Sequence, residues 1–415
     1  MILYFKVTNS RSFSKEAALS MIATKDYPND FSYQIDSHNI KVLKTSLVYG
    51  ANASGKSNLL KAFADASSII LNSHKYSKNS TENEDKAQAL KYYPNKNETL
   101  NTKKPTSYTF GLLIDNRMFE YSFSNNNERI FSESLIEKES SINEIVHFIR
   151  VYDRINNKYL FPQLSPEFKE KYETLIQFTK KENLFLSISA QLSEDVKYRI
   201  EIADLIWDFF KSKLHFSINL YAPGKSDTGF ALDLIRKNKK LKSEFLKYLK
   251  QADFSIIDIE FKAAIDENGK EKFIVNTIHK GLNEKQEPIL VIYDLFKEES
   301  VGTLQYIAWL GFWMLASAQK KTLIIDEFGN SMHPLLSEFL VNLFQNNEGQ
   351  LIFSTHDVKL MNIKYIKPEQ IWIVKKDNLS NSTIFPLSDF DIDSDKMIDN
   401  VYLDGIFDGV PNFTH

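Results

Sequence analysis

The residues best suited to chemistry form a glycine-rich loop near the start of the chain, Gly50-Ala-Asn-Ala-Ser-Gly55-Lys56-Ser57. A short apolar segment precedes this loop at residues 46–49, and a helical pattern follows it at residues 58–63. In such a strand–loop–helix context, glycines let backbone N–H groups surround a phosphate, and the positive end of the helix faces the same anion. We expect Lys56 to reach the β- and γ-phosphates of a nucleoside triphosphate and Ser57 to hold Mg²⁺. The intact Gly-Lys-Ser sequence disfavours the alternative of an ordinary Gly/Ser turn before a helix.

A pair of carboxylates follows a second apolar segment. Residues 321–325 read as a buried strand, and Asp326 and Glu327 come directly after it. Such a strand delivers Asp326 to the sheet edge, where it can bind Mg²⁺, often through water. Glu327 is then placed to orient and deprotonate an attacking water. A solvated acidic turn is the alternative, and the glycine-rich loop on the same chain favours the catalytic interpretation.

A histidine follows the next apolar strand. Residues 351–353 form that strand, and Ser354-Thr-His356-Asp comes after it. A lone histidine at a strand end is usually structural. Because this one lies one β-unit after the carboxylate pair, we expect His356 to touch the γ-phosphate or the catalytic water.

A second candidate anion contact opens a strongly apolar helical pattern at residues 303–318. Ser300 and Gly302 stand at its start. Serine at a helix start is an ordinary N-cap. A Ser-x-Gly helix N-terminus also presents N–H donors to an anion, as the glycine-rich loop does. Both interpretations stay open from the residues alone.

Composition limits the class of protein. The chain has 415 residues, 43% of them hydrophobic and 25% charged, which suits a globular protein of two or three structural units. A net charge of −3 does not indicate nucleic-acid binding by the protein as a whole, although a local basic face is compatible with it. The absence of cysteine excludes disulfides, cysteine zinc sites and thiol catalysis. There is no signal-peptide pattern and no run of 18 apolar residues, so we predict a cytoplasmic protein without a membrane segment.

The expected elements divide the chain into three parts. Residues 1–155 are β-rich around the glycine-rich loop and form an N-terminal lobe, with one strand over 40–49. Residues 156–285 form a mainly helical insertion, and residues 286–415 alternate between strand and helix as a C-terminal lobe. Helices of the insertion are expected over residues 166–181, 193–214 and 231–252. Alternation after residue 300 predicts a parallel sheet, which the strand before the glycine-rich loop must join across more than 240 residues. The predicted fold class is therefore α/β, a nucleotide-binding head with a split mixed and parallel sheet and a mainly helical insertion.

The four blocks, in this order, resemble the ABC-type ATPases of the SMC, RecF and OLD class. GANASGKSN is similar to their GxNxxGKSN loop, with Asn52 and Asn58 in the expected places. DEFGNSMHP is similar to their Walker B motif and following turn, although Met332-His333 stands where transporters carry Leu-Asp. Ser300 lies about 25 residues before Walker B, where this class keeps its signature motif, and Val301 departs from the glycine of the common signature.

The resemblance is closer to one branch, the small stand-alone ATPases of bacterial phage-defence and abortive-infection loci such as RloA, AbiLi and AriA. It rests on the residues 9–13, the E-S-V-G-T signature variant, D-E-F-x-N-S-x-H-P, S-T-H-D, Q-I-W at 370–372 and the tail from Tyr402. These motifs cover residues 1–70 and 285–415, and the middle of the chain resembles the family only loosely.

The resemblance implies an ATP-hydrolysing homodimer with ATP and Mg²⁺ sandwiched between two subunits. It implies ATP contacts from Gly50, Asn52, Gly55, Lys56, Ser57 and Asn58, metal contacts from Ser57 and Asp326, and catalysis by Glu327, His356 and Lys56. Ser300 and Gly302 of the other subunit would complete the site. Their helix would stabilise the transition state, which fits a chain without any arginine after Arg236.

The cellular role of an ATPase that dimerises on ATP is open to three interpretations. The first is a sensor or regulator of a separate effector, a nuclease or toxin, that responds to a phage-derived trigger. The second is a DNA-binding repair or chromosome ATPase of the RecF or SMC kind. Its basis is the basic run at residues 236–242, which is more often a solvated helix face. The third is an OLD-like nuclease.

Overall fold

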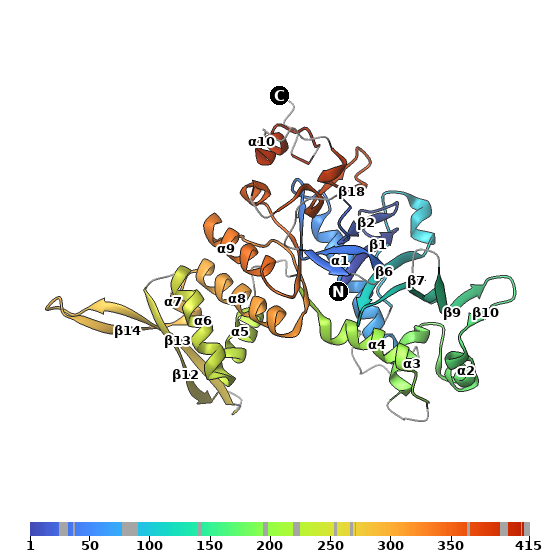
Figure 1. Cartoon of the computed structure of the whole chain (residues 1–415), viewed down its shortest axis with the longest axis horizontal. Helices are drawn as coiled ribbons and strands as arrows, with labels where there is room; N and C mark the ends of the chain where they lie inside the picture. The colour runs from blue at the N-terminus through green and yellow to red at the C-terminus, as the bar shows by residue number, and fades with distance from the viewer. Residues whose placement is uncertain are drawn as a thin grey trace.

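The chain folds around two large sheets and a small projecting one (Figure 1). The computed structural model describes residues 1–24, 32–35, 38–76, 90–139, 143–193, 198–218, 225–252, 255–265, 269, 271–362, 366–390, 397–407 and 409–410. None of the helices in these ranges has the length and apolar character needed to cross a membrane.

The central sheet is the parallel one. Its strands are β5 (Thr45–Tyr49), β11 (Leu214–Ser217), β15 (Thr322–Ile325), β16 (Gln350–Ser354), β17 (Ile371–Lys376) and β18 (Ser382–Pro386). They lie in the order β11-β15-β16-β5-β17-β18, with parallel pairing throughout except for the antiparallel β18. The strand before the glycine-rich loop therefore lies inside the sheet made by the C-terminal part of the chain, which confirms the predicted split α/β head.

Both faces of the parallel sheet are buried. Successive side chains along its strands pack alternately into two hydrophobic cores. On β15, Ile324 faces one hydrophobic cluster, whereas Leu323 and Ile325 face the other. On the neighbouring β16, Ile352 and Phe353 divide in the same way. Because successive side chains of a strand point to opposite faces, a continuous apolar run is what a doubly covered parallel strand requires.

A seven-stranded antiparallel sheet covers one side of the head. Its strands lie in the order β10-β9-β8-β7-β6-β1-β2. Their bounds are β1 (Ile2–Thr8), β2 (Ala17–Ser20), β6 (Thr106–Ile114), β7 (Arg117–Asn125), β8 (Ile130–Lys138), β9 (Glu144–Asp153) and β10 (Lys158–Leu164). Helix α1 (Lys56–Asn72) lies between the two large sheets. Its Phe63 ring is 4.4 Å from Phe5 and 5.4 Å from Phe110 of the antiparallel sheet, and 5.5 Å from Phe216 of the parallel sheet.

The remaining helices divide between the two cores: those of residues 166–213 pack with α1 and the antiparallel sheet, whereas those after residue 224 pack with the three-stranded sheet on the other side of the parallel sheet. The helices are α2 (Pro166–Phe178), α3 (Phe185–Leu192), α4 (Glu201–Asp208), α5 (Lys225–Lys237), α6 (Lys239–Ala252), α7 (Leu295–Glu298), α8 (Val301–Gln319), α9 (Pro334–Gln345) and α10 (Ile398–Leu403), with a π-helix η5 (Phe209–Lys213). The short 3₁₀ turns are η2 (Ser73–Lys75), η3 (Thr99–Lys103), η6 (Val358–Asn362), η7 (Pro368–Gln370) and η8 (Leu387–Asp389). The remaining strands are β12 (Ile256–Ile265), β13 (Glu271–Leu282) and β14 (Pro288–Asp294), which form a three-stranded sheet, and β3 (Ser32–Ile35) and β4 (Ile40–Leu43), which form a hairpin. In Figure 1 the β13–β14 hairpin projects from one end of the molecule and β9–β10 from the other.

Three expected elements differ from the observed ones. The strand expected over residues 40–49 is two strands, β4 and β5, which belong to different sheets. The helix expected over residues 193–214 gives way at Leu214 to β11, the edge of the parallel sheet. The helix expected over 231–252 is two helices, because the Asn238 side chain accepts from the backbone N–H groups of Lys240 and Leu241 and starts a new helix.

Strand pairs span both expected domain boundaries. Asp153 pairs with Lys158 across residue 155, and Leu282 pairs with Pro288 across residue 285. The division of the chain at these residues stays a prediction.

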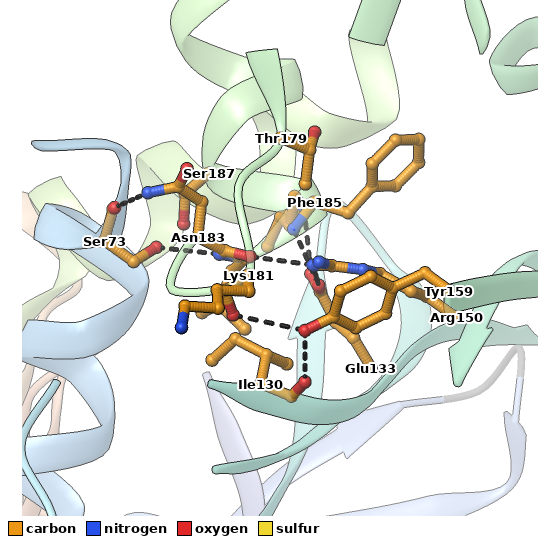
Figure 2. A network of polar contacts seen from close by, with 12 residues as sticks. Ser73, Ile130, Glu133, Arg150, Tyr159, Thr179, Lys181, Asn183, Phe185 and Ser187 are labelled. Carbon is orange, nitrogen blue, oxygen red and sulfur yellow. Dashed lines mark hydrogen bonds and ion pairs between the residues drawn. The ribbon is translucent and has the colours of Figure 1, made fainter. Parts of the chain in front are cut away.

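A buried polar network ties the far end of α1 to the antiparallel sheet (Figure 2). Glu133 of β8 accepts from the backbone N–H of Phe185 at 2.6 Å, at the start of α3, and lies 3.5 Å from the Arg150 guanidinium. Arg150 also donates to the Asn183 carbonyl at 2.7 Å, and the Asn183 amide donates to the Ser73 carbonyl just after α1. Burial raises the pKa of Glu133, and Arg150 with the N–H donors opposes that rise. The buried ion pair of Glu133 and Arg150 is therefore stable only when all of these hydrogen-bond partners are in place.

Replacing Arg150 with Met is expected to lower the free energy of unfolding by about 3–5 kcal/mol, because it leaves the Glu133 carboxylate buried without its cation. Urea unfolding followed by circular dichroism measures the change. Arg154→Met is the matched control, since Arg154 is exposed and stacks on Phe131, so less than about 1 kcal/mol is expected there. Equal losses in the two variants would contradict a structural role for the buried pair.

Candidate nucleotide-binding site

Two glycines let the loop between β5 and α1 pass close to other backbone. Gly50 has φ 146°, and a Cβ there would lie 2.2 Å from the Val374 carbonyl oxygen. Gly55 has φ 122°, and a Cβ there would lie 2.3 Å from the Ser382 hydroxyl. Any side chain would be strained in backbone and in space at both positions. The loop is thus held against β17 and β18, and the Ser382 hydroxyl further donates to the Ser54 carbonyl.

Lys56 begins helix α1 and is almost fully buried. Its Nζ donates to the carbonyl oxygens of Gly50 at 2.7 Å and Ala51 at 3.2 Å, so the ammonium lies over the loop itself. Burial lowers the pKa of Lys56 to about 8, while the charges of Asp326 and Glu327 act in the opposite direction. The effect of these two charges on Lys56 indicates that the ammonium lies near both predicted carboxylates, Asp326 and Glu327.

The other loop residues that are predicted to contact the nucleotide lie in different surroundings. Ser57 is half-buried in the first turn of α1, and Asn52 is exposed at the loop tip. The Asn58 amide donates to the Ser12 hydroxyl at 3.0 Å, so this side chain braces the loop after β1. A cavity of about 370 Å³ opens beside this turn, lined among others by Asn58, Arg11 and Tyr93. The Arg11 guanidinium lies over the Tyr93 ring, 4.3 Å from its centre.

A serine of β16 bonds both acidic residues at the end of β15, Asp326 through its carboxylate and Glu327 through its backbone. The Ser354 hydroxyl donates to Asp326 at 2.5 Å and accepts from the backbone N–H of Glu327 at 2.9 Å. Glu327 has φ 57°, a left-handed conformation that is uncommon outside glycine and clusters at functional sites. Its carboxylate is exposed and accepts from the Asn330 amide at 3.0 Å. The sequence analysis gave Ser354 no role, although its place at the end of the strand next to β15 is the signal that could have identified it.

His356 lies in the loop directly after β16. Its ring is accessible, and partial burial followed by the positive charge of Lys56 lowers the pKa of its imidazole, while Glu327 and Asp326 act in the opposite direction. The imidazole is therefore neutral at pH 7. Because β15, β16 and β5 are parallel neighbours, their carboxyl ends meet at one edge, and the structure brings Lys56, Asp326, Glu327 and His356 together there.

The candidate signature residues lie at the start of α8 and not at this edge. Ser300 is the N-cap of α8, and its hydroxyl accepts from the backbone N–H of Thr303 at 3.0 Å. A Cβ at Gly302 would lie 2.6 Å from the Ser331 carbonyl oxygen, so the helix start packs against the turn that follows Glu327. In the described ranges, the side-chain bonds of Ser300 stay within its own helix turn.

The lowered pKa of Lys56 predicts a pH dependence of nucleotide binding. A phosphate group favours the ammonium form, so above about pH 8 binding must take up a proton, and the affinity falls as the pH rises. We expect the Kd for ATP to increase about tenfold between pH 7.5 and pH 9.

Calorimetry in buffers of different ionisation enthalpy measures both the affinity and the proton uptake. In Lys56→Arg, whose guanidinium stays protonated, the slope with pH should be lost whatever the absolute affinity. Binding of ATP without proton uptake at pH 8.5 would overturn the assignment.

A phosphate-binding loop between a parallel strand and a helix, with an acidic pair on a nearby strand, defines the class of P-loop nucleotide-binding proteins. The chain belongs to the family described as "AAA domain, putative AbiEii toxin, Type IV TA system", whose sequence pattern matches residues 46–362, more than half of its length. No curated protein matches it.

The solved structures that are similar to the chain include an SMC head and a RecF protein. The SmcHead bound to the C-winged helix domain of ScpA has 10% identity, with 93% of this chain and 97% of that chain covered and a TM-score of 0.41. The recombination mediator protein RecF with ATP, of the RecFOR pathway, has 14% identity, with 85% and 93% covered and a TM-score of 0.34.

Proposed function

We propose that this protein hydrolyses ATP at the carboxyl edge of its parallel sheet. The observation that carries the proposal is the gathering of Lys56, Asp326, Glu327 and His356 on three neighbouring parallel strands and their following loops. Lys56 neutralises the β- and γ-phosphates. Glu327 orients a water and accepts its proton, and the neutral imidazole of His356 contacts the γ-phosphate or that water.

The remaining loop residues bind the rest of the nucleotide and its metal. The backbone of Gly50, Asn52 and Gly55 surrounds the phosphates, and the first turn of α1 at Asn58 leads to the cavity beside it. Ser57 and Asp326 supply a hydroxyl and a carboxylate, which are the oxygen donors that Mg²⁺ prefers alongside phosphate oxygens. Bound Mg²⁺ would neutralise charge that develops on the phosphates. Ser354 restrains Asp326 for this role through one carboxylate oxygen.

We further propose that the active form is a dimer in which Ser300 and Gly302 of one subunit face the nucleotide of the other. The support is the exposed setting of this helix start. Val301 is 53% exposed in the first turn of α8, and Leu335 is 67% exposed in the first turn of α9. Apolar side chains of this size beside an anion-binding helix start suit a surface that closes on a partner. ATP would close the dimer, and hydrolysis would reopen it.

The cellular role that we propose is regulation of a separate effector, a nuclease or toxin, in anti-phage defence in the cytoplasm. The family description names the AbiEii toxin and a toxin–antitoxin system, which supports a defence role. The resemblance to RloA, AbiLi and AriA supports the same role, with a phage-derived trigger.

The alternative of a DNA-binding ATPase of the RecF or SMC kind rests on the basic run at residues 236–242. Arg236 and Lys237 both pair with Asp233, each at 2.5 Å, and Lys242 pairs with Asp258 at 2.7 Å. Arg236 also stacks on Phe273. Because internal partners hold these side chains, the run favours a structural helix face over a surface for phosphates.

Two measurements test the proposal. Purified protein should release phosphate from ATP with Mg²⁺, Lys56→Ala should not, and the exposed-site control Lys359→Ala should keep the normal rate. A pull-down of tagged Glu327→Gln protein from its native locus with ATP should recover a stoichiometric second protein. Recovery of the ATPase alone, together with steeply salt-dependent stimulation by DNA, would favour the DNA-binding alternative; cleaved nucleic acid in the assay would favour a nuclease.

A further inference from the structure

Glu299, the residue before Ser300, accepts hydrogen bonds from two side chains of β13 in the three-stranded sheet. Its Oε1 accepts from the Thr277 hydroxyl at 2.5 Å and from the His279 Nε2 at 2.6 Å. Thr277 is fully buried on β13, and His279 is 9% exposed on the same face of that strand. The carboxylate therefore has two side-chain donors in a largely water-free setting, where charge-assisted hydrogen bonds are strong.

The polar chain continues on the far side of His279. Its Nδ1 lies 2.9 Å from the Ser255 hydroxyl, in the turn before β12, and the edge of its ring meets Tyr293 of β14 with 4.7 Å between ring centres. Because Nε2 faces a carboxylate, we assign the ring proton to Nε2, so that Nδ1 accepts from Ser255. The turn before β12 and strand β14 thus both help to hold His279 of β13 in one orientation.

The start of α8 is fixed from two sides as a result. Behind it, Glu299 is tied to β13. In front of it, Gly302 packs on the Ser331 carbonyl oxygen in the turn after Glu327. Only short α7 separates β14 from Glu299, so a shift of the sheet moves Ser300 relative to the catalytic edge.

We propose that Thr277 and His279 are positioning residues, which set Ser300 through Glu299 for the nucleotide of the partner subunit. This inference rests on the proposed function. It makes the projecting sheet of Figure 1 the element whose position controls turnover. A displacement of about 1 Å at a catalytic contact can cost about 10²-fold in rate, so the hydrogen bonds to Glu299 have a kinetic effect larger than their contribution to stability.

The first test is Thr277→Val, which keeps the side-chain shape and removes the hydroxyl. We expect kcat to fall about 10- to 100-fold, while the Kd for ATP changes less than about twofold, because the P-loop of the same subunit is untouched. Thr277→Ser, which restores the donor, should recover the rate. His279→Gln, which keeps an N–H donor, serves as a second variant. A variant that unfolds at lower temperature with normal kcat would show that these residues only stabilise the fold.

The second test separates positioning from general damage by using mixed dimers purified through two tags. With Thr277→Val in one chain and Lys56→Ala in the other, the one functional P-loop faces an unchanged signature, and this dimer should match a dimer of Lys56→Ala with wild type. With both changes in the same chain and a wild-type partner, the functional P-loop faces the altered signature, and turnover should be slow. Equal rates in the two arrangements would overturn the inference, whereas absence of hydrolysis in the wild type would overturn the proposed function instead.

Discussion

Glu327→Gln is expected to bind ATP with normal affinity and to hydrolyse it about 10²- to 10⁴-fold more slowly than the wild type, because glutamine cannot accept the proton of the attacking water. The substitution is close to isosteric. Asn330 and the backbone bond to Ser354 can hold the new side chain in the same place. Phosphate release measures turnover, and chromatography of the protein-bound nucleotide shows that ATP rather than ADP is retained. Size-exclusion chromatography with ATP should show a trapped dimer.

Glu338→Gln is the matched control for this experiment. Glu338 is exposed on α9, so its replacement should leave both turnover and ATP binding unchanged. A normal rate in Glu327→Gln would show that another group accepts the proton. Loss of ATP binding would show instead that Glu327 shapes the site before chemistry begins.

The second large effect concerns the composite site that the proposed dimer would form. Lys56→Ala and Ser300→Arg are each expected to abolish hydrolysis when alone, since every homodimer then carries two defective sites. In a mixed dimer, the P-loop of the Ser300→Arg chain meets the signature of the Lys56→Ala chain, and one intact site results. Random pairing of equal amounts should therefore restore about a quarter of the wild-type activity, as symmetry of the two sites requires.

A mixture of Lys56→Ala with Glu327→Gln is the matched control for complementation. Both changes lie on the P-loop side of the site, so no mixed dimer contains an intact site and no recovery is expected. Activity of Ser300→Arg by itself would contradict a role for the signature. Recovery of activity in the control mixture would show that each subunit contributes more to its partner's site than the signature contact.

Much of the site could be predicted from the sequence because each motif is a short run of residues. Such a run specifies its own backbone conformation and its place at the end of a strand. Gly50 and Gly55 have the positive φ values that a glycine-rich loop implies. The apolar runs before Glu327 and His356 predicted buried parallel strands, and parallel strands bring their carboxyl ends to one edge. The expectation that the strand before the loop joins the C-terminal sheet followed from the same rule.

Other contacts depend on register between segments that are distant in the chain, and no local pattern specifies them. Ser354 meets Asp326 only because β16 lies beside β15. Strand β11, Leu214–Ser217, alternates apolar and polar residues over only four positions, and only its pairing with β15 distinguishes it from the end of a helix. The bond between Glu299 and His279 joins residues twenty positions apart, and only the position of β13 beside the start of α8 brings them together.

The sequence by itself determined the class of this protein, because the phosphate loop, the acidic pair and the histidine carry their chemistry in residue type and spacing. Only the tertiary structure decided how that chemistry is held. Asp326 and Glu327 take their orientation from Ser354, the far end of α1 is tied by the buried Glu133–Arg150 pair, and Ser300 is positioned through β13. The physical reason is that a hydrogen bond or a buried charge is stabilising only when its partner lies at the right distance, and folding alone brings these partners together.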